Sequence, residues 1–429
     1  MENLEIKYLI IGAGISGLTF AQKCKNEFLI VEKSDSVGGY CKTFYVKDYV
    51  WDYAGHFYHF KNDSIKEKFL SMYSPNELVL KDKNTKIMYK DKLINYPFQT
   101  NIHQLEKEEF IDCLYDLYNK DEKQTYDNFV DMLYGKFGVS IVKKFLKPYN
   151  EKLYACDLYK LDTNAMGRFF PYADVKQIIN NMKSNDSDRK SYNSTFLYPK
   201  KGAQTYINKI YSNLDSKRVM LNTAVTKIDL KNKEVYTNNN KKIKYKYLIN
   251  TSPLTDFLGF INEYKLKNKL SYNKVLVFNM GFKKASKFKE DWIYIPDKSV
   301  SFYRIGFYNN ILGKEKLSVY IELGFSKDEN IDVDYYYNKV MQDMKKLGII
   351  EDNELDCYNY LIMDPAYVHI NEETSTEIHN LFAKLQKNNI YSIGRYGAWT
   401  YCSMEDCIVM ANSTYESIDE IERNEDNEN

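Results

Sequence analysis

The stretch that decides the fold lies at the start of the chain, where residues 4–12 read LEIKYLIIG, residues 12–17 read GAGISG and residues 28–32 read FLIVE. An apolar run typical of a buried strand enters a glycine turn, a helix-like segment follows, and a second apolar strand ends in an acid. Such glycines let backbone N–H groups approach a pyrophosphate at the helix N-terminus. Glu32 follows Gly12 by 20 residues, the spacing at which a carboxylate can bind ribose hydroxyls. The pattern predicts a dinucleotide-binding domain, and the alternative is a glycine turn in another kind of α/β protein.

A second glycine pair follows the acid and strengthens this interpretation. Together with the first turn it defines the predicted cofactor-binding set, which is Gly12, Gly14, Gly17, Glu32, Lys33, Gly38 and Gly39.

Composition limits the class of protein. The 429 residues are enough for two or three domains, and a net charge of +1 with 28% charged residues argues against a nucleic-acid-binding protein. Seven cysteines without a CxxC motif fit a reduced, cytoplasmic protein. No leader-like stretch and no apolar run near ~20 residues is present, so we expect no membrane insertion.

The rest of the chain indicates an interrupted nucleotide domain. Residues 106–119, 126–137 and 140–147 have helical spacing of apolar residues, whereas several strand patterns follow between residues 274 and 325. Strands that would complete the first sheet return near residues 218–252 and 390–394. This layout is typical of large FAD enzymes rather than compact NAD dehydrogenases.

The predicted fold class is therefore α/β, a Rossmann-like FAD-binding domain interrupted by a helical domain and an antiparallel β-sheet domain. The predicted boundaries are 1–95, 195–260 and 385–429 for the FAD-binding domain, 96–194 for a mainly helical substrate and nucleotide domain, and 261–384 for the sheet domain.

Short motifs follow one another along the chain. They are GHFYH at 55–59, YPFQTNI at 96–102, PYNEKLYA at 148–155, MGR at 166–168, YPKKG at 198–202, FYR at 302–304, GRYGAWTY at 394–401 and ED at 405–406. In this order they resemble the motifs of the UDP-galactopyranose mutase family, closer to its eukaryotic than its bacterial type, within the amine-oxidase-like FAD fold.

The resemblance implies an isomerase that interconverts the pyranose and furanose forms of a nucleotide sugar, most simply UDP-galactopyranose and UDP-galactofuranose. In that family, N5 of the reduced flavin attacks the anomeric carbon and UDP leaves. The implied cofactor is reduced FAD, with NADPH or NADH as the candidate reductant. The implied partner is a UDP-sugar destined for cell-surface polysaccharide, and the helical insertion is the suggested contact surface of a homo-oligomer.

Residues within these motifs suit such chemistry. A departing diphosphate accumulates negative charge, which arginine hydrogen bonds stabilise. The resemblance assigns the catalytic set Arg304, Arg168, Tyr401 and His56, and adds His59 and Arg395 to the cofactor-binding set. Without the family motifs, each arginine would be read as a surface ion-pair residue and each histidine as a structural loop residue.

Uridine requires a flat stacking surface and an amide to pair with its edge. The predicted substrate-binding set is Tyr96, Phe98, Gln99, Asn150, Tyr154 and Glu405. Tyr96 and Phe98 are more often core aromatics when the family is disregarded. Tyr154 replaces the family's Trp, and Glu405 replaces its Asn, which places an acid near the expected diphosphate.

Other interpretations of these motifs stay open at this point. His56 and His59 form an HxxH pair, but no third ligand is evident, so we predict no metal site. Cys402 and Cys407 lie near the same motif, and we interpret them as buried bystander thiols. The alternative function is an FAD-dependent oxidoreductase of the amine oxidase, protoporphyrinogen oxidase or desaturase kind. The third candidate function is that of a non-catalytic flavoprotein.

Overall fold

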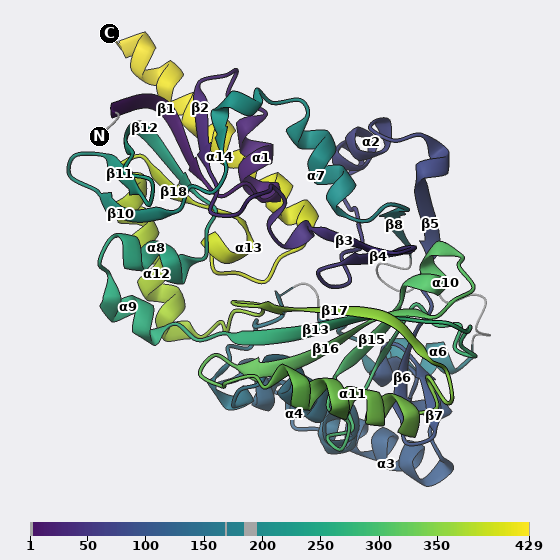
Figure 1. The fold of residues 1–429 in the computed structure, drawn as a ribbon. Coiled ribbons are helices and arrows are strands. Elements are labelled where there is room, and N and C mark those ends of the chain that lie inside the picture. Colours follow the sequence, from purple (N-terminus) through teal and green to yellow (C-terminus); the bar gives the residue numbers. More distant parts are fainter. Residues whose placement is uncertain (1–2, 168–169, 184–194, 429) are drawn as a thin grey trace.

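The computed structural model describes residues 3–167, 170–183 and 195–428. Within these ranges the strands form two seven-stranded sheets and two short ribbons. Figure 1 shows the second sheet between the first-sheet layer and the helices α3 (Lys107–Tyr118), α4 (Phe129–Ile141) and α11 (Val333–Lys346).

The first sheet is the Rossmann-like one. Its order is β10 (Val225–Asp229), β11 (Glu234–Thr237), β12 (Lys242–Asn250), β1 (Asn3–Ile11), β2 (Phe28–Val31) and β9 (Val219–Met220), with β18 (Ile390–Ser392) paired to β12. β1 runs parallel to β2 and β12, and β12 runs parallel to β18. The predicted return of distant segments to the first strand is therefore confirmed.

Alternation along β1 explains why both faces of this sheet are covered. Tyr8 and Ile10 pack with α1 (Ile15–Ala21), α7 (Gln204–Tyr211) and α14 (Met404–Glu428). Leu9 and Ile11 point the opposite way, into a cluster with α8 (Leu254–Phe260) and α12 (Glu372–Gln386). A parallel strand that is buried on both faces needs apolar residues at consecutive positions, as in residues 8–11.

The second sheet is mostly antiparallel. Its order is β17 (Leu355–Met363), β13 (Asn273–Phe282), β16 (Ser318–Ser326), β15 (Arg304–Phe307), β14 (Trp292–Tyr294), β6 (Thr85–Tyr89) and β7 (Lys92–Asn95). Only β6 and β14 pair in parallel among these strands of the described chain. β6 and β7 belong to this sheet, although their residues fall within the range predicted for the first domain.

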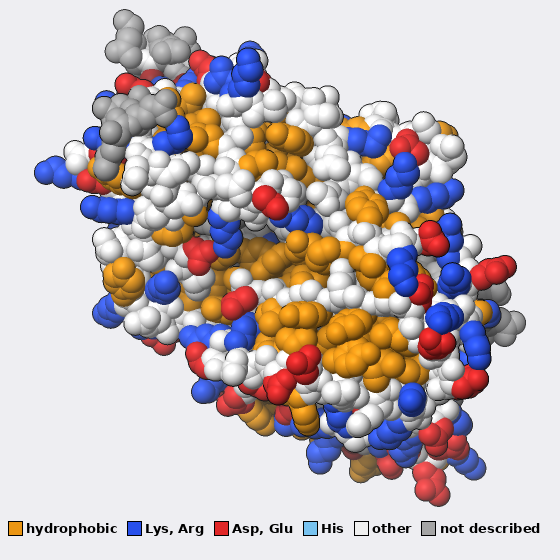
Figure 2. All heavy atoms as spheres, viewed as in Figure 1, with side chains coloured by type: hydrophobic (Ala, Val, Ile, Leu, Met, Phe, Trp, Pro, Cys, Tyr) orange, Lys and Arg blue, Asp and Glu red, His pale blue; other side chains and the backbone are white. Residues whose placement is uncertain are grey.

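The outer strand β17 leaves apolar side chains exposed, among them Tyr358, Tyr360 and Ile362. Figure 2 shows apolar side chains gathered over β17 and α11 on this face of the molecule.

The remaining elements connect these layers. They are α2 (Asp63–Ser71), the ribbon of β3 (Thr43–Val46) and β4 (Tyr49–Asp52), the ribbon of β5 (Leu78–Asp82) and β8 (Thr195–Pro199), α5 (Lys147–Tyr154), α6 (Val175–Lys183), α9 (Tyr264–Lys269), α10 (Tyr308–Leu312) and α13 (Gly394–Gly397). Helices α3 to α6 form the predicted helical insertion, so the predicted fold class is confirmed. None of the helices in the described ranges is both long and apolar enough to cross a membrane.

Candidate functional site

A cavity of about 660 Å³ lies between the two sheets. The ends of β1, β2 and the segment after β12 form one wall, and residues of β14, β15 and β16 form the opposite wall. Ligands of open α/β sheets bind at the carboxyl ends of parallel strands, so the topology places this cavity where a dinucleotide belongs.

The glycine turn is shaped for close backbone approach. A Cβ on Gly17 would lie 2.1 Å from the carbonyl oxygen of Gly12, so this glycine is required for α1 to pack on β1. A Cβ on Gly14 would meet nothing within 4 Å, because its Cα faces the cavity. Gly12 has φ +100, a backbone conformation that side chains rarely adopt. The turn therefore leaves room for a phosphate at the start of α1.

The acid at the end of β2 is fixed beside this turn. Glu32 accepts hydrogen bonds from the backbone N–H groups of Ala13 (2.7 Å) and Ser34 (2.8 Å), one on each carboxylate oxygen. A carboxylate accepts up to about four hydrogen bonds, so capacity remains for ribose hydroxyls. Lys33 is largely exposed beside it and pairs with Asp256 at 3.6 Å.

The second glycine pair closes the other side of the turn. Gly38 and Gly39 line the cavity, and a Cβ on Gly39 would be in van der Waals contact with the Cα of Gly14, at 3.5 Å. All seven residues of the predicted turn and acid set thus lie together, and six of them line the cavity; Gly17 is the packing glycine behind it.

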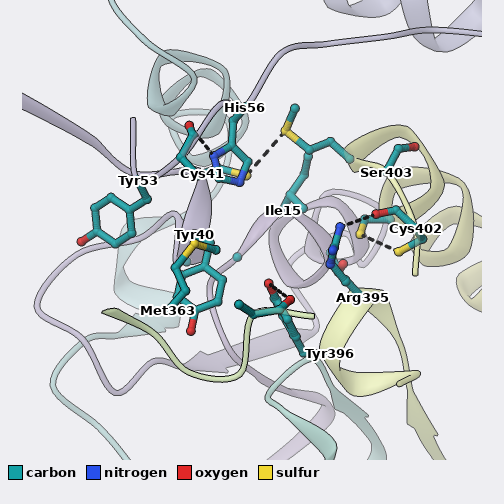
Figure 3. Close-up of a pocket in the computed structure, with 18 of the residues that line it drawn as sticks. Ile15, Tyr40, Cys41, Tyr53, His56, Met363, Arg395, Tyr396, Cys402 and Ser403 are labelled. Atoms are coloured by element: carbon teal, nitrogen blue, oxygen red, sulfur yellow. Dashed lines mark hydrogen bonds between the residues drawn. The ribbon is translucent and has the colours of Figure 1, made fainter. Parts of the chain in front are cut away.

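Arg395 is partly buried and surrounded by tyrosine rings on the same cavity. Its guanidinium carbon lies 4.7 Å from the ring centre of Tyr401, 5.2 Å from Tyr367 and 5.9 Å from Tyr396. Nη1 donates to the carbonyl oxygen of Cys402 at 3.1 Å, whereas Nε has no hydrogen-bond partner among the described residues. Figure 3 shows Arg395 beside Tyr396 and Cys402 at the cavity wall.

The two predicted histidines line the cavity as neutral groups. Nδ1 of His56 donates to the Ala54 carbonyl at 3.1 Å, and Nδ1 of His59 donates to the Thr195 carbonyl at 3.1 Å. Burial lowers the pKa of His56 to about 4, and burial together with the charge of Lys83 lowers the pKa of His59 to about 4. In the described part of the chain, no three His, Cys, Asp or Glu residues gather as metal ligands would.

Arg304 projects from β15 at the opposite wall, where it is paired. Its Nε and Nη2 donate to the two carboxylate oxygens of Glu322 at 2.8 and 2.7 Å. Tyr401 also lines the cavity, with its ring stacked on that of Tyr367 at 5.9 Å. Arg168, the other predicted arginine, lies outside the described residues.

Lys83 is a cavity residue that the sequence analysis missed. It lies in the loop between β5 and β6, and its Nζ is 5.4 Å from the centre of the Tyr96 ring. Burial lowers the pKa of Lys83 to about 8. No signal in a lysine-rich chain distinguishes this position, because only the packing of the two sheets brings it to the cavity.

Several predicted substrate residues do not reach the cavity. Phe98 is fully buried and stacks on Phe145 at 5.2 Å, as the core interpretation expected. Asn150 donates to the Leu146 carbonyl within its own helix at 2.7 Å. Tyr154 is buried in the same helical core. These three line no part of the cavity, because their side chains are buried within the helical insertion.

The other predicted substrate residues lie nearer. Tyr96 lines the cavity and packs against Tyr294 at 5.0 Å. Gln99 is buried one layer behind, and its amide donates to the carbonyl of Pro171, a residue of the cavity wall.

Glu405 lines the cavity, but its carboxylate is occupied. One oxygen accepts from the backbone N–H groups of Lys61 (2.9 Å) and Asn62 (2.8 Å), at the start of α2. The acid that replaces the family's Asn thus anchors a loop, and its charge is compensated by two amide dipoles.

Comparison with known proteins supports this fold. Residues 10–71 match the model of an NAD(P)-binding Rossmann-like domain. A crystal structure of reduced UDP-galactopyranose mutase is similar with a TM-score of 0.90 and 21% identity, covering 97% of this chain and 94% of that one. A candidate protoporphyrinogen oxidase from Exiguobacterium sp. 255-15 is similar with a TM-score of 0.73, 15% identity, and 96% and 98% coverage.

Oxidases share the architecture at lower similarity. Putrescine oxidase bound to putrescine gives a TM-score of 0.66 at 12% identity, covering 97% of this chain and 99% of that one. The resemblance that the motifs indicated is therefore confirmed at the level of the fold: this chain has the fold of UDP-galactopyranose mutase, built on a Rossmann-like nucleotide-binding domain.

Proposed function

We propose that this protein is a flavin-dependent mutase that interconverts the pyranose and furanose forms of a nucleotide sugar, with UDP-galactose as the simplest substrate. One observation carries the proposal. A single cavity joins the dinucleotide-binding turn, with Arg395 on the same side, to a wall that holds Lys83 and Arg304. Cations on that wall suit a substrate with a diphosphate group.

The charge balance of the cavity supports an anionic ligand. Arg304 is neutralised by Glu322, but neither Lys83 nor Arg395 pairs with a carboxylate among the described residues. A buried cation without a counter-charge is costly, and a bound phosphate relieves that cost. Two such cations in one cavity fit one anionic cofactor and one anionic substrate.

The residues of the turn fit FAD. The open Cα of Gly14 and the N-terminus of α1 would hold the pyrophosphate, Glu32 the ribose, and the unpaired Nε of Arg395 an oxygen acceptor of the cofactor. When bound and reduced, FAD supplies a nucleophilic nitrogen, N5, which is the group this reaction requires.

The protein's own work is to bind and orient the sugar nucleotide. As the bond from the anomeric carbon to the diphosphate breaks, negative charge accumulates on the diphosphate oxygens. Arg304, held flat by Glu322, can donate its remaining N–H groups to those oxygens, and Lys83 adds a positive charge at the same end. Tyr401 lines the same cavity, and in this proposal its hydroxyl also donates to the diphosphate.

Packed aromatic rings make part of this wall apolar. Phe57 stacks face to face on Trp292, with ring centres 5.3 Å apart and planes at 4°, and Tyr96 packs on Tyr294. Excluding water strengthens the hydrogen bonds to the diphosphate and protects a reactive sugar from hydrolysis.

The second candidate is an FAD-dependent oxidoreductase, which the shared architecture with putrescine oxidase favours. The oxidoreductase function does not explain why cations lie at the substrate end of the cavity. It also predicts that turnover consumes oxygen or another electron acceptor, whereas an isomerase has no net electron transfer.

One assay separates the two. The purified protein is incubated with UDP-galactofuranose without oxygen, with and without dithionite, and the products are separated by chromatography. Conversion to UDP-galactopyranose only in the reduced sample supports the mutase. A yellow, reducible protein that leaves the sugar unchanged, and that also fails with other UDP-sugars, overturns it in favour of the oxidoreductase.

A further inference from the structure

Two cysteines meet at the wall of the cofactor cavity. Cys402 precedes α14 and Cys407 lies within its first turns, and their sulfur atoms are 3.7 Å apart. Both side chains are buried from bulk solvent, yet both line the cavity. Figure 3 shows Cys402 at its right, beside Arg395.

The start of α14 explains why the two thiols face each other. Ser403 caps the helix: its N–H donates to Asp406 at 2.8 Å, and its hydroxyl accepts from the Asp406 N–H at 3.1 Å. The residue before such a cap packs against the fourth residue of the helix. Cys402 and Cys407 occupy these two positions, where apolar side chains are usual.

The surroundings favour a thiolate on Cys407. Hydrogen bonds from the Cys402 thiol and from the Ser16 hydroxyl, together with the positive charge of Arg395, lower the pKa of Cys407 below that of an ordinary thiol. The same contact raises the pKa of Cys402, which stays protonated. We assign Cys407 as the nucleophile because the Ser16 hydroxyl and the Arg395 backbone also contact its sulfur, and Cys402 as the proton-bearing partner.

We propose that Cys402 and Cys407 are a redox-active pair that hydrogen peroxide, reaching them through the cavity, converts into a disulfide. The Cys407 thiolate attacks one peroxide oxygen and the O–O bond breaks. Hydroxide departs, and Cys407 becomes a sulfenic acid. The Cys402 sulfur then attacks the Cys407 sulfur, the S–O bond breaks, and the thiol proton leaves with the hydroxide as water. The two thiols lose two electrons, and the peroxide gains them.

Closure of the pair couples to the cofactor site. The sulfur atoms must approach from 3.7 Å to about 2.0 Å. The carbonyl of Cys402 accepts from Arg395, and Ser16 belongs to the glycine-turn helix, so both contacts of the pair are cavity residues. Any movement of the Cys402 backbone on closure would therefore reach Arg395, which lines the cavity.

A third thiol that lines the cavity provides a matched control. Cys41 also lines the cavity, but its sulfur contacts Met404 at 3.7 Å rather than another thiol. Burial raises the pKa of Cys41, so it stays protonated. Cys41→Ser leaves the pair intact.

The test follows the thiols by mass. The purified protein, with its bound cofactor, is treated with hydrogen peroxide, alkylated under denaturing conditions and cut with trypsin, which releases residues 396–423 with both cysteines in one peptide. We expect this peptide to escape alkylation and to lose two hydrogens, in the wild type and in Cys41→Ser, and dithiothreitol to reverse both changes.

Single variants assign the two roles. In Cys402→Ser, Cys407 should accumulate as a sulfenic acid that dimedone labels, and in Cys407→Ser dimedone should label neither position. Far-ultraviolet circular dichroism checks that each variant is folded. Full alkylation of both cysteines after peroxide treatment of the wild type overturns the proposal, and so does oxidation that passes irreversibly to the sulfinic acid.

Discussion

Arg304 and Glu322 lie directly opposite each other on β15 and β16, and form a two-pronged ion pair at the cavity wall. The Glu322 side chain is 1% exposed and that of Arg304 is 19% exposed, so the carboxylate lies behind the guanidinium as seen from the cavity. The pair holds the guanidinium plane in one orientation. Its structural and functional roles can therefore be separated by mutation.

We predict that Arg304→Ala lowers turnover at least tenfold, because charge-assisted hydrogen bonds to the leaving diphosphate contribute about 1.5–3 kcal/mol each. The variant also leaves Glu322 without its partner, which costs about 3–5 kcal/mol of stability. Arg304→Ala/Glu322→Gln should regain most of the lost melting temperature and none of the turnover. Steady-state kinetics and thermal melts measure both, and wild-type turnover in the double variant would contradict the assigned role.

Lys83→Met should raise the KM for the nucleotide sugar about tenfold while leaving FAD content unchanged, since Lys83 lies beside Tyr96 at the end of the cavity away from the glycine turn. Lys83→Arg should stay close to the wild type. The pKa of Lys83 is lowered to about 8, so substrate affinity of the wild type should fall as the pH rises through that value. An unchanged KM in Lys83→Met would remove this residue from the substrate site.

Gly14→Ala and Gly17→Ala form a matched pair. The methyl group at Gly14 meets only open cavity, so this variant should fold with a near-normal melting temperature but lose FAD affinity at least tenfold. The methyl group at Gly17 would lie 2.1 Å from a backbone oxygen, so that variant should fold poorly. Absorbance of bound flavin and circular dichroism distinguish the two. Equal FAD retention in Gly14→Ala would argue against a pyrophosphate at this turn.

Glu405→Ala should lower stability by about 1.5–3 kcal/mol, because it removes the carboxylate that accepts from the amides of Lys61 and Asn62. Glu405→Gln keeps an acceptor oxygen and should cost less. Since that carboxylate is engaged with the loop, we expect both variants to keep a KM within about twofold of the wild type. If a folded variant shows a larger change in KM, Glu405 takes part in substrate recognition.

His369→Gln should weaken the pH dependence of the free energy of unfolding on the acid side of neutrality. Burial lowers the pKa of His369 to about 4 from its usual 6.5, while its ring contacts the Tyr154 carbonyl and the Ser271 hydroxyl. Between these two pH values the unfolded chain binds more protons, so the free energy of unfolding falls as the pH drops from 6.5 toward 4.

The measurement is urea unfolding at several pH values, and the comparison is the difference between wild type and variant. That difference cancels the contributions of other groups, among them Asp52, whose pKa burial raises to about 7 and whose effect has the opposite sign. A pH-independent difference would mean that His369 titrates normally in the folded protein.

The glycine turn, the acid at Glu32 and the segments that return to β1 could all be predicted from the sequence. Each depends on local physics: a positive φ, a close approach between helix and strand, or an apolar run long enough for a doubly covered strand. His56, Arg395 and Tyr401 also line the cavity, as their motifs predicted. They adjoin strands or turns that the predicted topology brings to this place.

Only the tertiary structure decided which charged residues reach the cavity and pair there, and which aromatic residues are buried in the core instead. The pairing of Arg304 with Glu322 depends on the register of two strands, and Lys83 reaches the cavity because β6 joins the second sheet. Likewise Phe98 and Tyr154 turn into the core of the helical insertion, since sequence spacing does not specify which side of a helix faces a ligand. A sequence determines short-range conformation through its backbone preferences, whereas long-range contacts exist only once sheets and helices have packed.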